Sequence, residues 1–419
     1  MKIISILPHI PANEIFKNIS KADIKTRFSS SEFIDIDERP YLVGFHRLDW
    51  HHRWSTYIKT LSPDVEIECW RPYGNDINIV YKQNVDGILH KVFPSKSIRF
   101  KKIGDYETSW PLLNELKKEI HAGQIIIHFY GSNSPIIFWL LNKLKPYGIP
   151  VILQHLGWSF SYFEYKYGNN PLKLIPYYFQ RKALKYVNLY LTASKVEEKF
   201  LHDHFPKLKV VFFLNGIDFS KLPEVTKKDA RIKLNIPYDA KMILYVGRYY
   251  CTKNVGEIIK AYNSLKTQNE NYMLFLVGGY RTDEYYQLAI DSDAQVVLRK
   301  DESIYQYFAA ADIYLMPIKD RMHQDFGGFG IAPIESLAYN TPVVSSNLKH
   351  FSGTSSEMSE IGICIDDTNK LVTIIDKFFE NSSPQYSRCR EMAEKYYDLK
   401  KNSLEMIGYY KSLISQFQP

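Results

Sequence analysis

The sequence predicts an α/β protein with two doubly wound domains, each a parallel sheet covered by helices. First, short apolar runs alternate with longer amphipathic stretches, which is the pattern of repeated βαβ units. Second, the alternation occurs in two sets, interrupted at residues 215–228 by a polar segment that contains Gly216 and Pro223. Third, a chain of 419 residues is long enough for two or three domains.

Residues 1–220 form the first set and are assigned to the first domain. Strands are expected at short apolar runs, and helices where apolar side chains recur every three or four positions. The expected strands are Lys2–Leu7, Tyr41–Phe45, Val65–Cys69, Ile125–Phe129, Val151–Gln154 and Leu189–Thr192. The expected helices are Trp54–Leu61, Trp110–Ile120, Pro135–Leu144 and Pro176–Tyr186.

Residues 221–394 form the second set and are assigned to the second domain. The expected strands are Met242–Val246, Met273–Val277, Val296–Leu298, Ile313–Met316, Val343–Ser345 and Ile363–Ile365. The expected helices are Val255–Thr267, Asp283–Ala289, Ile304–Ala310, Pro333–Ala338 and Leu371–Phe379. A mixed stretch, Arg388–Phe417, is expected to form a C-terminal helix.

Composition excludes wholesale disorder, because 45% of the residues are hydrophobic and 24% are charged. The longest apolar run, Pro135–Leu141, is far shorter than the roughly 18 residues of a membrane span. The first residues, MKIISILPHIPANE, indicate a strand rather than a signal peptide. The four cysteines form no C-x-x-C pair, which excludes a zinc ribbon and fits a reducing, cytoplasmic location.

The excess positive charge belongs to the first half of the chain. Residues 1–220 hold 29 Lys and Arg against 21 Asp and Glu, and the remainder holds 24 against 25. This asymmetry indicates an anionic partner or an ordinary solvated surface. Residues 165–186 add many aromatic side chains, which is typical of a helix on an anionic membrane, or of a helix whose Tyr face packs on the sheet. Without a recognisable binding module, no nucleic-acid partner is expected.

Two cations follow the first strand of the second domain. The strand ends at Gly247, where glycine permits a tight turn, and a helix is expected to begin near Asn254. Arg248 and Lys253 lie between them and are suited to binding a diphosphate at the carboxyl end of the strand. Taken alone, such residues are more often simply solvated.

A glycine-rich segment, Phe326-Gly-Gly-Phe-Gly-Ile-Ala-Pro-Ile-Glu335, leads into a later helix of the same domain. Unpaired N–H groups at a helix start attract phosphate or sugar oxygens. Glu335 lies one turn into the helix, where a carboxylate can accept hydrogen bonds from two ribose hydroxyls. The alternative is a glycine-rich turn with a purely structural role.

In their order and spacing, these segments resemble retaining glycosyltransferases of the GT-B fold, family 4 (glycosyl transferases group 1). The resemblance covers roughly residues 187–350. It is carried by Asn215-Gly-Ile-Asp218, Val246-Gly-Arg248 with Lys253-Asn254, Ala309-Ala-Ala-Asp312 before Pro317, and the segment ending in Glu335 before Thr341-Pro-Val-Val344. The first half matches in outline, at Ile125–Tyr130, Gln154–Gly157 and Leu191–Ser194.

The resemblance implies two Rossmann-like domains facing a central cleft, with the chain from about residue 395 crossing back to the first domain. It implies metal-independent, retaining transfer of a hexose-type sugar from a UDP- or GDP-linked donor, without a cofactor, to a glycan or lipid-linked acceptor. Arg248 and Lys253 would hold the diphosphate, Glu335 the ribose, and His155 would approach the reacting sugar. The remaining donor-site residues implied are Gly247, Gly328, Phe329, Gly330 and Ile331.

The sequence departs from the family pattern in two places. Gly327 stands where the family has a second Glu, so Asp325 or His323 is expected to contact the transferred sugar instead; otherwise the sugar is bound differently or the enzyme is slow. The competing interpretation of Gly327 is a degenerate, non-catalytic member that binds a glycan or supports a partner enzyme. The glycine-rich loop after the first strand is also missing, and residues 45–54 stand in its place. The acceptor-side residues expected are His46, Arg47, Asp49, Arg53, Tyr130 and Gly131.

No metal site is expected. A site built from His46, His51 and His52 is disfavoured, because adjacent histidines do not easily face one ion. The two Asp-x-Asp matches, at residues 35–37 and 291–293, lack a supporting strand and are interpreted as surface acids.

Overall fold

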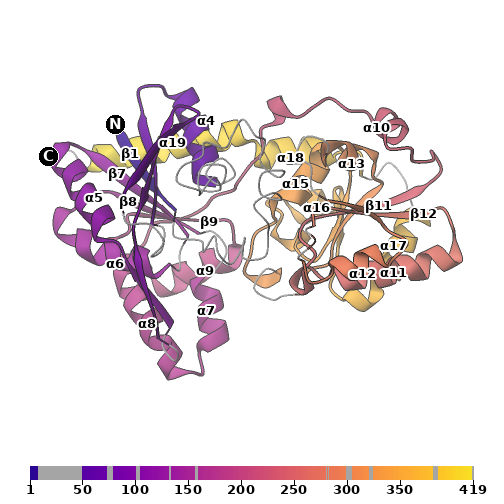
Figure 1. Cartoon of the computed structure of the whole chain (residues 1–419), viewed down its shortest axis with the longest axis horizontal. Coiled ribbons are helices and arrows are strands. Elements are labelled where there is room, and N and C mark those ends of the chain that lie inside the picture. The colour runs from indigo at the N-terminus through magenta and orange to yellow at the C-terminus, as the bar shows by residue number, and fades with distance from the viewer. Residues whose placement is uncertain are drawn as a thin grey trace. The chain divides into compact units, whose positions relative to one another are not determined.

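The computed structural model describes residues 1–7, 50–72, 79–100, 104–131, 134–155, 159–279, 281, 283–298, 304–319, 324–380 and 386–417. The chain divides into two compact units, Met1–Phe213 with Lys400–Pro419, and Leu214–Leu399 (Figure 1). The boundaries predicted at residues 220 and 394 both fall inside the second unit. The predicted strand Tyr41–Phe45 and the candidates His46, Arg47, Asp49 and His323 lie outside the described residues.

The first unit contains an eight-stranded sheet in the order β10-β9-β8-β7-β1-β2-β4-β3. Neighbouring strands are parallel except β3 and β4, which form a hairpin through Asp86 and Gly87, both at positive φ. A two-stranded sheet, β5 with β6, follows the hairpin. The strands are β1 Lys2–Ile6, β2 Glu66–Pro72, β3 Tyr81–Val85, β4 Ile88–Phe93, β5 Lys96–Phe100, β6 Gly104–Thr108, β7 Ile125–Tyr130, β8 Val151–Gln154, β9 Leu189–Thr192 and β10 Val210–Phe212.

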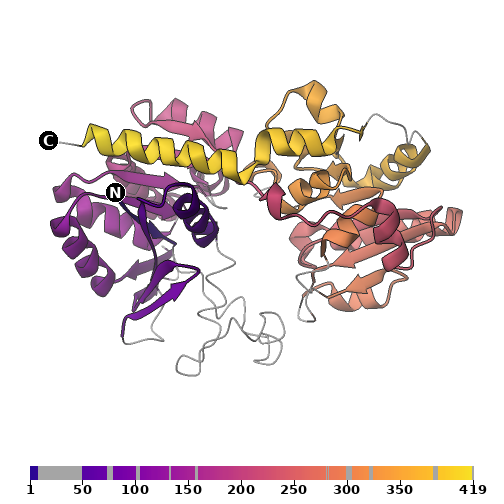
Figure 2. The same ribbon diagram turned by 90° about the horizontal axis from the view of Figure 1, so that it is seen from above.

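Helices cover both faces of this sheet, and the C-terminal helix is one of them (Figure 2). Tyr410 of that helix hydrogen-bonds through its hydroxyl to His128 Nδ1 at 2.7 Å, and Gln124 Nε2 donates to the Ile414 carbonyl at 3.3 Å. The last residues of the chain therefore belong to the first unit. The helices are α4 Trp50–Leu61, α5 Trp110–Ala122, α6 Pro135–Leu144, α7 Phe160–Tyr167, α8 Pro171–Ala183, α9 Lys195–His204 and α19 Leu399–Gln416. None of the helices described in either unit is long and apolar enough to cross a membrane.

A buried carboxyl group makes the stability of the first unit pH-dependent. Glu107 on β6 is 7% exposed and accepts a hydrogen bond from the Ser95 hydroxyl at 2.6 Å. Burial raises the pKa of Glu107 from its ordinary value of 4.5 to about 7.

We expect the free energy of unfolding to fall by about 3 kcal/mol as the pH rises from 4.5 to above 7. Over this range the unfolded chain loses the Glu107 proton first, so the folded state binds more protons and is destabilised by raising the pH. Denaturant unfolding of wild type and Glu107→Gln across pH 5–8 measures the effect. An identical pH dependence in the variant would contradict the assignment.

The second unit contains a six-stranded, wholly parallel sheet in the order β13-β12-β11-β14-β15-β16. Its strands are β11 Lys241–Val246, β12 Tyr272–Val277, β13 Gln295–Val297, β14 Ile313–Met316, β15 Val343–Ser345 and β16 Gly362–Cys364. The chain starts at the centre with β11, adds strands on one side, and then returns to add β14 on the other. Ligands of doubly wound sheets bind at the carboxyl ends of the strands where this reversal occurs, here between β11 and β14.

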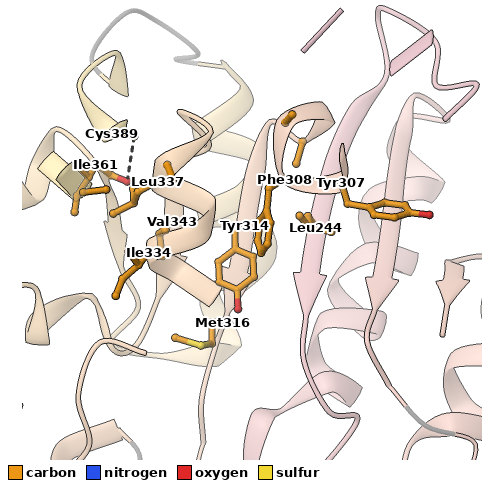
Figure 3. Close-up of a cluster of buried hydrophobic side chains, with 14 of the residues drawn as sticks. Leu244, Tyr307, Phe308, Tyr314, Met316, Ile334, Leu337, Val343, Ile361 and Cys389 are labelled. Carbon is orange, nitrogen blue, oxygen red and sulfur yellow. Dashed lines mark hydrogen bonds between the residues drawn. The ribbon is translucent and has the colours of Figure 1, made fainter. Parts of the chain in front are cut away.

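Side chains alternate between two apolar cores on the faces of this sheet. Leu244, Tyr314 and Val343 point to one face, where Phe308 and Leu337 from the covering helices meet them (Figure 3). Their strand neighbours Ile243, Leu315 and Val344 point to the other. The helices are α10 Lys227–Lys233, α11 Val255–Gln268, α12 Tyr286–Ile290, α13 Ile304–Ala310, α15 Ile331–Ala338, α16 Ser355–Ser359, α17 Leu371–Glu380 and α18 Cys389–Tyr397. Burial on both faces explains why these strands are short continuous apolar runs in the sequence.

Candidate functional site

The loop after β11 turns sharply at Gly247. Its φ is +153°, its N–H donates to the Val277 carbonyl at 2.9 Å, and a Cβ at this position would lie 2.9 Å from the Tyr245 hydroxyl. Only a glycine fits here, where the chain turns out of β11 while its backbone stays hydrogen-bonded to the end of β12. The next residue, Arg248, therefore lies at the carboxyl edge of the sheet.

Asp283 holds the guanidinium of Arg248 in place. Nε of Arg248 lies 2.9 Å and Nη2 2.7 Å from Asp283 Oδ1, and Asp283 Oδ2 accepts the N–H of Tyr249 at 2.9 Å. The Asp283 side chain is fully buried, whereas Arg248 is 27% exposed. The guanidinium also lies over the Tyr250 ring, with 4.5 Å between its Cζ and the ring centroid. Arg248 is thus a positioned cation, suited to binding an anionic group.

Lys253 lies at the start of α11. It ends a short 3-10 turn, Cys251–Lys253, and Asn254 follows in the left-handed conformation at φ +59° before the helix begins. The turn contacts the loop after β14, since the Lys319 N–H donates to the Thr252 carbonyl at 3.3 Å. The loops after β11 and β14, which flank the reversal of strand order, are therefore joined.

The glycine-rich segment is fixed to the end of β15. Asn347, the second residue after β15, is buried and donates from Nδ2 to the Gly328 carbonyl at 3.0 Å. The Phe329 ring packs in the core, 5.7 Å from the Tyr397 ring centroid and 5.9 Å from that of Phe351. Gly330, at φ +91°, then caps α15 without a side-chain hydrogen bond. The backbone N–H groups at the start of α15 are therefore not capped by a side chain at Gly330 and can meet a ligand.

Glu335 is half-buried on α15, and its charge acts on Tyr314 beneath it. Burial, and after it the Glu335 carboxylate, raises the pKa of Tyr314. The Tyr314 hydroxyl donates to the Val246 carbonyl at 3.3 Å, directly before Gly247. Tyr314, whose pKa Glu335 raises, thus contacts the strand end from which Arg248 follows.

Asp325 is bound by a lysine. Its Oδ1 lies 2.7 Å from Lys349 Nζ, and the neighbouring Gln324 carbonyl lies 2.7 Å from His350 Nε2. The segment before the glycines is thereby attached to the turn that follows β15. Gly327 is half-buried two residues farther along.

The sequence-predicted residues of the first unit lie on different elements. His155 follows β8, is buried, and places Nδ1 3.2 Å from the Thr192 hydroxyl. Tyr130 ends β7 in the interior, with its ring stacked on His128 at 4.2 Å. Gly131 follows at φ +101°, and Arg53 is half-buried on α4. The other acceptor-side candidates lie outside the described residues, so the acceptor-side group stays a prediction.

Asp283, Asn347 and Tyr314 are site-building residues that sequence reasoning missed. Of these three, only Asp283 could have been suspected from the sequence, because it is an acid after the glycines that follow β12. Acids in loops are usually solvated, however, so this position alone does not indicate a site. Asn347 and Tyr314 act through contacts within the fold, and no sequence motif predicts these contacts.

The second unit thus combines a doubly wound parallel sheet with a positioned cation at its carboxyl edge. Residues 226–396, which lie within the second unit, match the family described as glycosyl transferases group 1, and this match confirms the predicted resemblance for this part of the chain.

Two curated relatives match part of the chain. A putative teichuronic acid biosynthesis glycosyltransferase, TuaC of Bacillus subtilis, is 27% identical over 146 residues, which are 32% of this chain and 35% of the relative. The capsular polysaccharide biosynthesis glycosyltransferase CapM of Staphylococcus aureus is 27% identical over 139 residues, with the same coverage. The chain thus spans about a third of the length of these relatives.

The likeness in structure extends over the whole chain. Sucrose-phosphate synthase from Thermosynechococcus elongatus gives a TM-score of 0.64 at 15% identity, covering 99% of this chain and 100% of that one. Anabaena Alr3699/HepE in complex with UDP gives 0.63 at 14%, covering 98% and 100%. At these identities the likeness establishes the fold, and the predicted GT-B fold is confirmed.

Proposed function

We propose that this protein is a glycosyltransferase that moves a hexose-type sugar from a nucleoside-diphosphate donor to a hydroxyl of a glycan or lipid-linked acceptor. The observation that carries the proposal is the cation pair at the carboxyl edge of β11, with Arg248 positioned by Asp283 and Lys253 at the start of α11. Structural neighbours named as complexes with UDP support the choice of donor.

The proposed reaction follows from charge. The bond between the sugar and the diphosphate breaks, and negative charge grows on the departing phosphate. Arg248 and Lys253 stabilise that charge without a metal, and N–H groups at the start of α15 add to the field. Glu335 binds the ribose, and the acceptor hydroxyl attacks from the face that the phosphate leaves, passing its proton to a phosphate oxygen. The configuration of the sugar is retained.

Because Gly327 has no carboxylate, another residue must contact the transferred sugar. Asp325 is our candidate, because Lys349 holds it at the start of the glycine-rich segment. His155 is our candidate for the first unit's contribution to the sugar.

A donor screen tests the activity. The full-length protein is incubated with UDP- and GDP-linked hexoses and a mixture of glycan and polyprenol-linked acceptors, and products are identified by mass. We expect one donor to give a product heavier by one hexose. Nucleotide binding without any product would instead favour the non-catalytic alternative suggested by Gly327.

We further propose that the first unit binds an anionic membrane, where lipid-linked acceptors lie. On α8, Tyr178 is 54% and Phe179 61% exposed, and Lys182 Nζ lies 4.4 Å from the Tyr178 ring centroid. Tyr177 and Arg181 face inward and bind Glu164. The helix thus packs on the unit with one face and presents aromatic and cationic side chains on another, as interfacial helices do.

We expect Tyr178→Ser/Phe179→Ser to weaken binding to phosphatidylglycerol vesicles by roughly tenfold, since each ring buries apolar surface in the interface. Co-sedimentation at low and high salt measures it, and salt should weaken wild-type binding. Tyr238→Ser in the second unit, also strongly exposed, is the matched control. Equal sedimentation with neutral vesicles would contradict membrane recognition through charge.

A further inference from the structure

A row of polar side chains crosses one face of the first sheet. His128 on β7, Ser5 on β1, Cys69 on β2 and His90 on β4 are register partners in four adjacent strands. Register partners of parallel strands point to the same face, and all four side chains are buried. Helix α4 contacts β1, β2 and β4 on this sheet and contributes His51, which is also fully buried.

Three ligand atoms converge within this row. One nitrogen of His51, the sulfur of Cys69 and one nitrogen of His90 all lie within 4.8 Å of one another. Among the described residues, neither ring nitrogen of His51 has a hydrogen-bond partner.

Hydrogen bonds fix which nitrogen His90 offers. The Asp86 carboxylate can only accept, so His52 Nε2, 3.1 Å away, carries the proton. His52 Nδ1 lies 2.8 Å from His90 Nε2, so these two nitrogens share a hydrogen bond. His90 Nδ1 is therefore the nitrogen that can face a metal ion. A histidine oriented by a second group in this way is the usual outer arrangement of a metal ligand.

We propose that His51, Cys69 and His90 bind one zinc ion. Nitrogen and sulfur donors suit zinc, and a tetrahedral site places such donors roughly 3.3–3.6 Å apart. The three atoms lie within 4.8 Å of one another, so zinc binding would draw the side chains closer together. Coordination replaces the Cys69 thiol proton, and a water takes the fourth position. The ion ties α4 to β2 and β4. This site lies within the first unit and is separate from the proposed donor site.

Metal analysis of the full-length protein tests the site. We expect about one zinc per chain after purification and dialysis against metal-free buffer. Cys69→Ser and His51→Gln should lose the zinc, whereas the exposed controls Cys251→Ser and His121→Gln should keep it. Asp86→Asn, which suits the positive φ at this position, should bind zinc about 10–100-fold more weakly.

Cobalt substitution keeps the test valid if a variant fails to fold. Wild-type protein loaded with Co²⁺ alone should show a near-ultraviolet thiolate-to-cobalt band from Cys69. Substoichiometric zinc in wild type together with no such band would overturn the proposal. Retention of zinc by folded Cys69→Ser and His51→Gln would overturn it as well, as would copper in place of zinc.

Discussion

Replacing Arg248 with alanine is expected to lower kcat by about 10²–10³-fold, because the leaving phosphate loses a positioned cation. The same change leaves the buried Asp283 carboxylate without its ion-pair partner, which destabilises the fold by about 3–5 kcal/mol. The effect on activity must therefore be measured separately from the effect on stability. This requires product formation expressed per folded molecule, with the folded fraction taken from a thermal melt of the same sample.

The double variant Arg248→Ala/Asp283→Asn provides the separation. It removes both charges, so the melting temperature should recover while activity stays low. Lys260→Ala on α11, an exposed lysine paired with Glu257, is the matched charge control and should behave as wild type. Recovered activity in the double variant would show that Arg248 acts only through the fold.

Gly279→Ala is expected to destabilise the second unit by about 3 kcal/mol or more and to lower the melting temperature by roughly 6–12 °C. A Cβ at Gly279 would lie 2.2–2.4 Å from three atoms of the Tyr249 ring. This ring is fully buried, and its hydroxyl donates a hydrogen bond to the Leu276 carbonyl at 2.6 Å. The ring therefore cannot move aside without losing that hydrogen bond and its packing. Since Tyr249 follows Arg248, activity should fall in parallel.

Gly408→Ala is the control for Gly279→Ala. Gly408 lies inside α19, and nothing is within 4 Å of a Cβ placed there. Alanine in a helix interior should stabilise the protein by roughly 0.5–1 kcal/mol. Equal melting temperatures for the two variants would contradict the close packing of Tyr249 on Gly279.

The parallel strands could be predicted because burial on both faces makes them continuous apolar runs. The β3–β4 hairpin was missed although Asp86-Gly87 is a strong turn signal, since β3, Tyr-Lys-Gln-Asn-Val, is mostly polar and partly exposed. The predicted C-terminal helix Arg388–Phe417 is two helices, because the chain is extended at Asp398, where the Ile217 backbone pairs with it.

The candidate site was predictable where its residues directly follow a strand or open a helix, as Arg248, Lys253 and Glu335 do. Asp283 was not, because its pairing with Arg248 depends on β11 and β12 being neighbours. The zinc ligands show the same limit. Sequence proximity offered only His46, His51 and His52, a combination that was disfavoured, whereas strand register places Cys69 beside His90, close to His51 on α4.

The central claim is that a nucleoside diphosphate binds at the carboxyl edge of β11. Calorimetric titration of UDP and GDP into full-length wild type, Lys253→Ala and Lys260→Ala tests it most directly. We predict that at least one nucleotide binds wild type and Lys260→Ala equally well, and binds Lys253→Ala at least about tenfold more weakly. Equal affinity in Lys253→Ala, or no binding of either nucleotide to wild type, would contradict the claim.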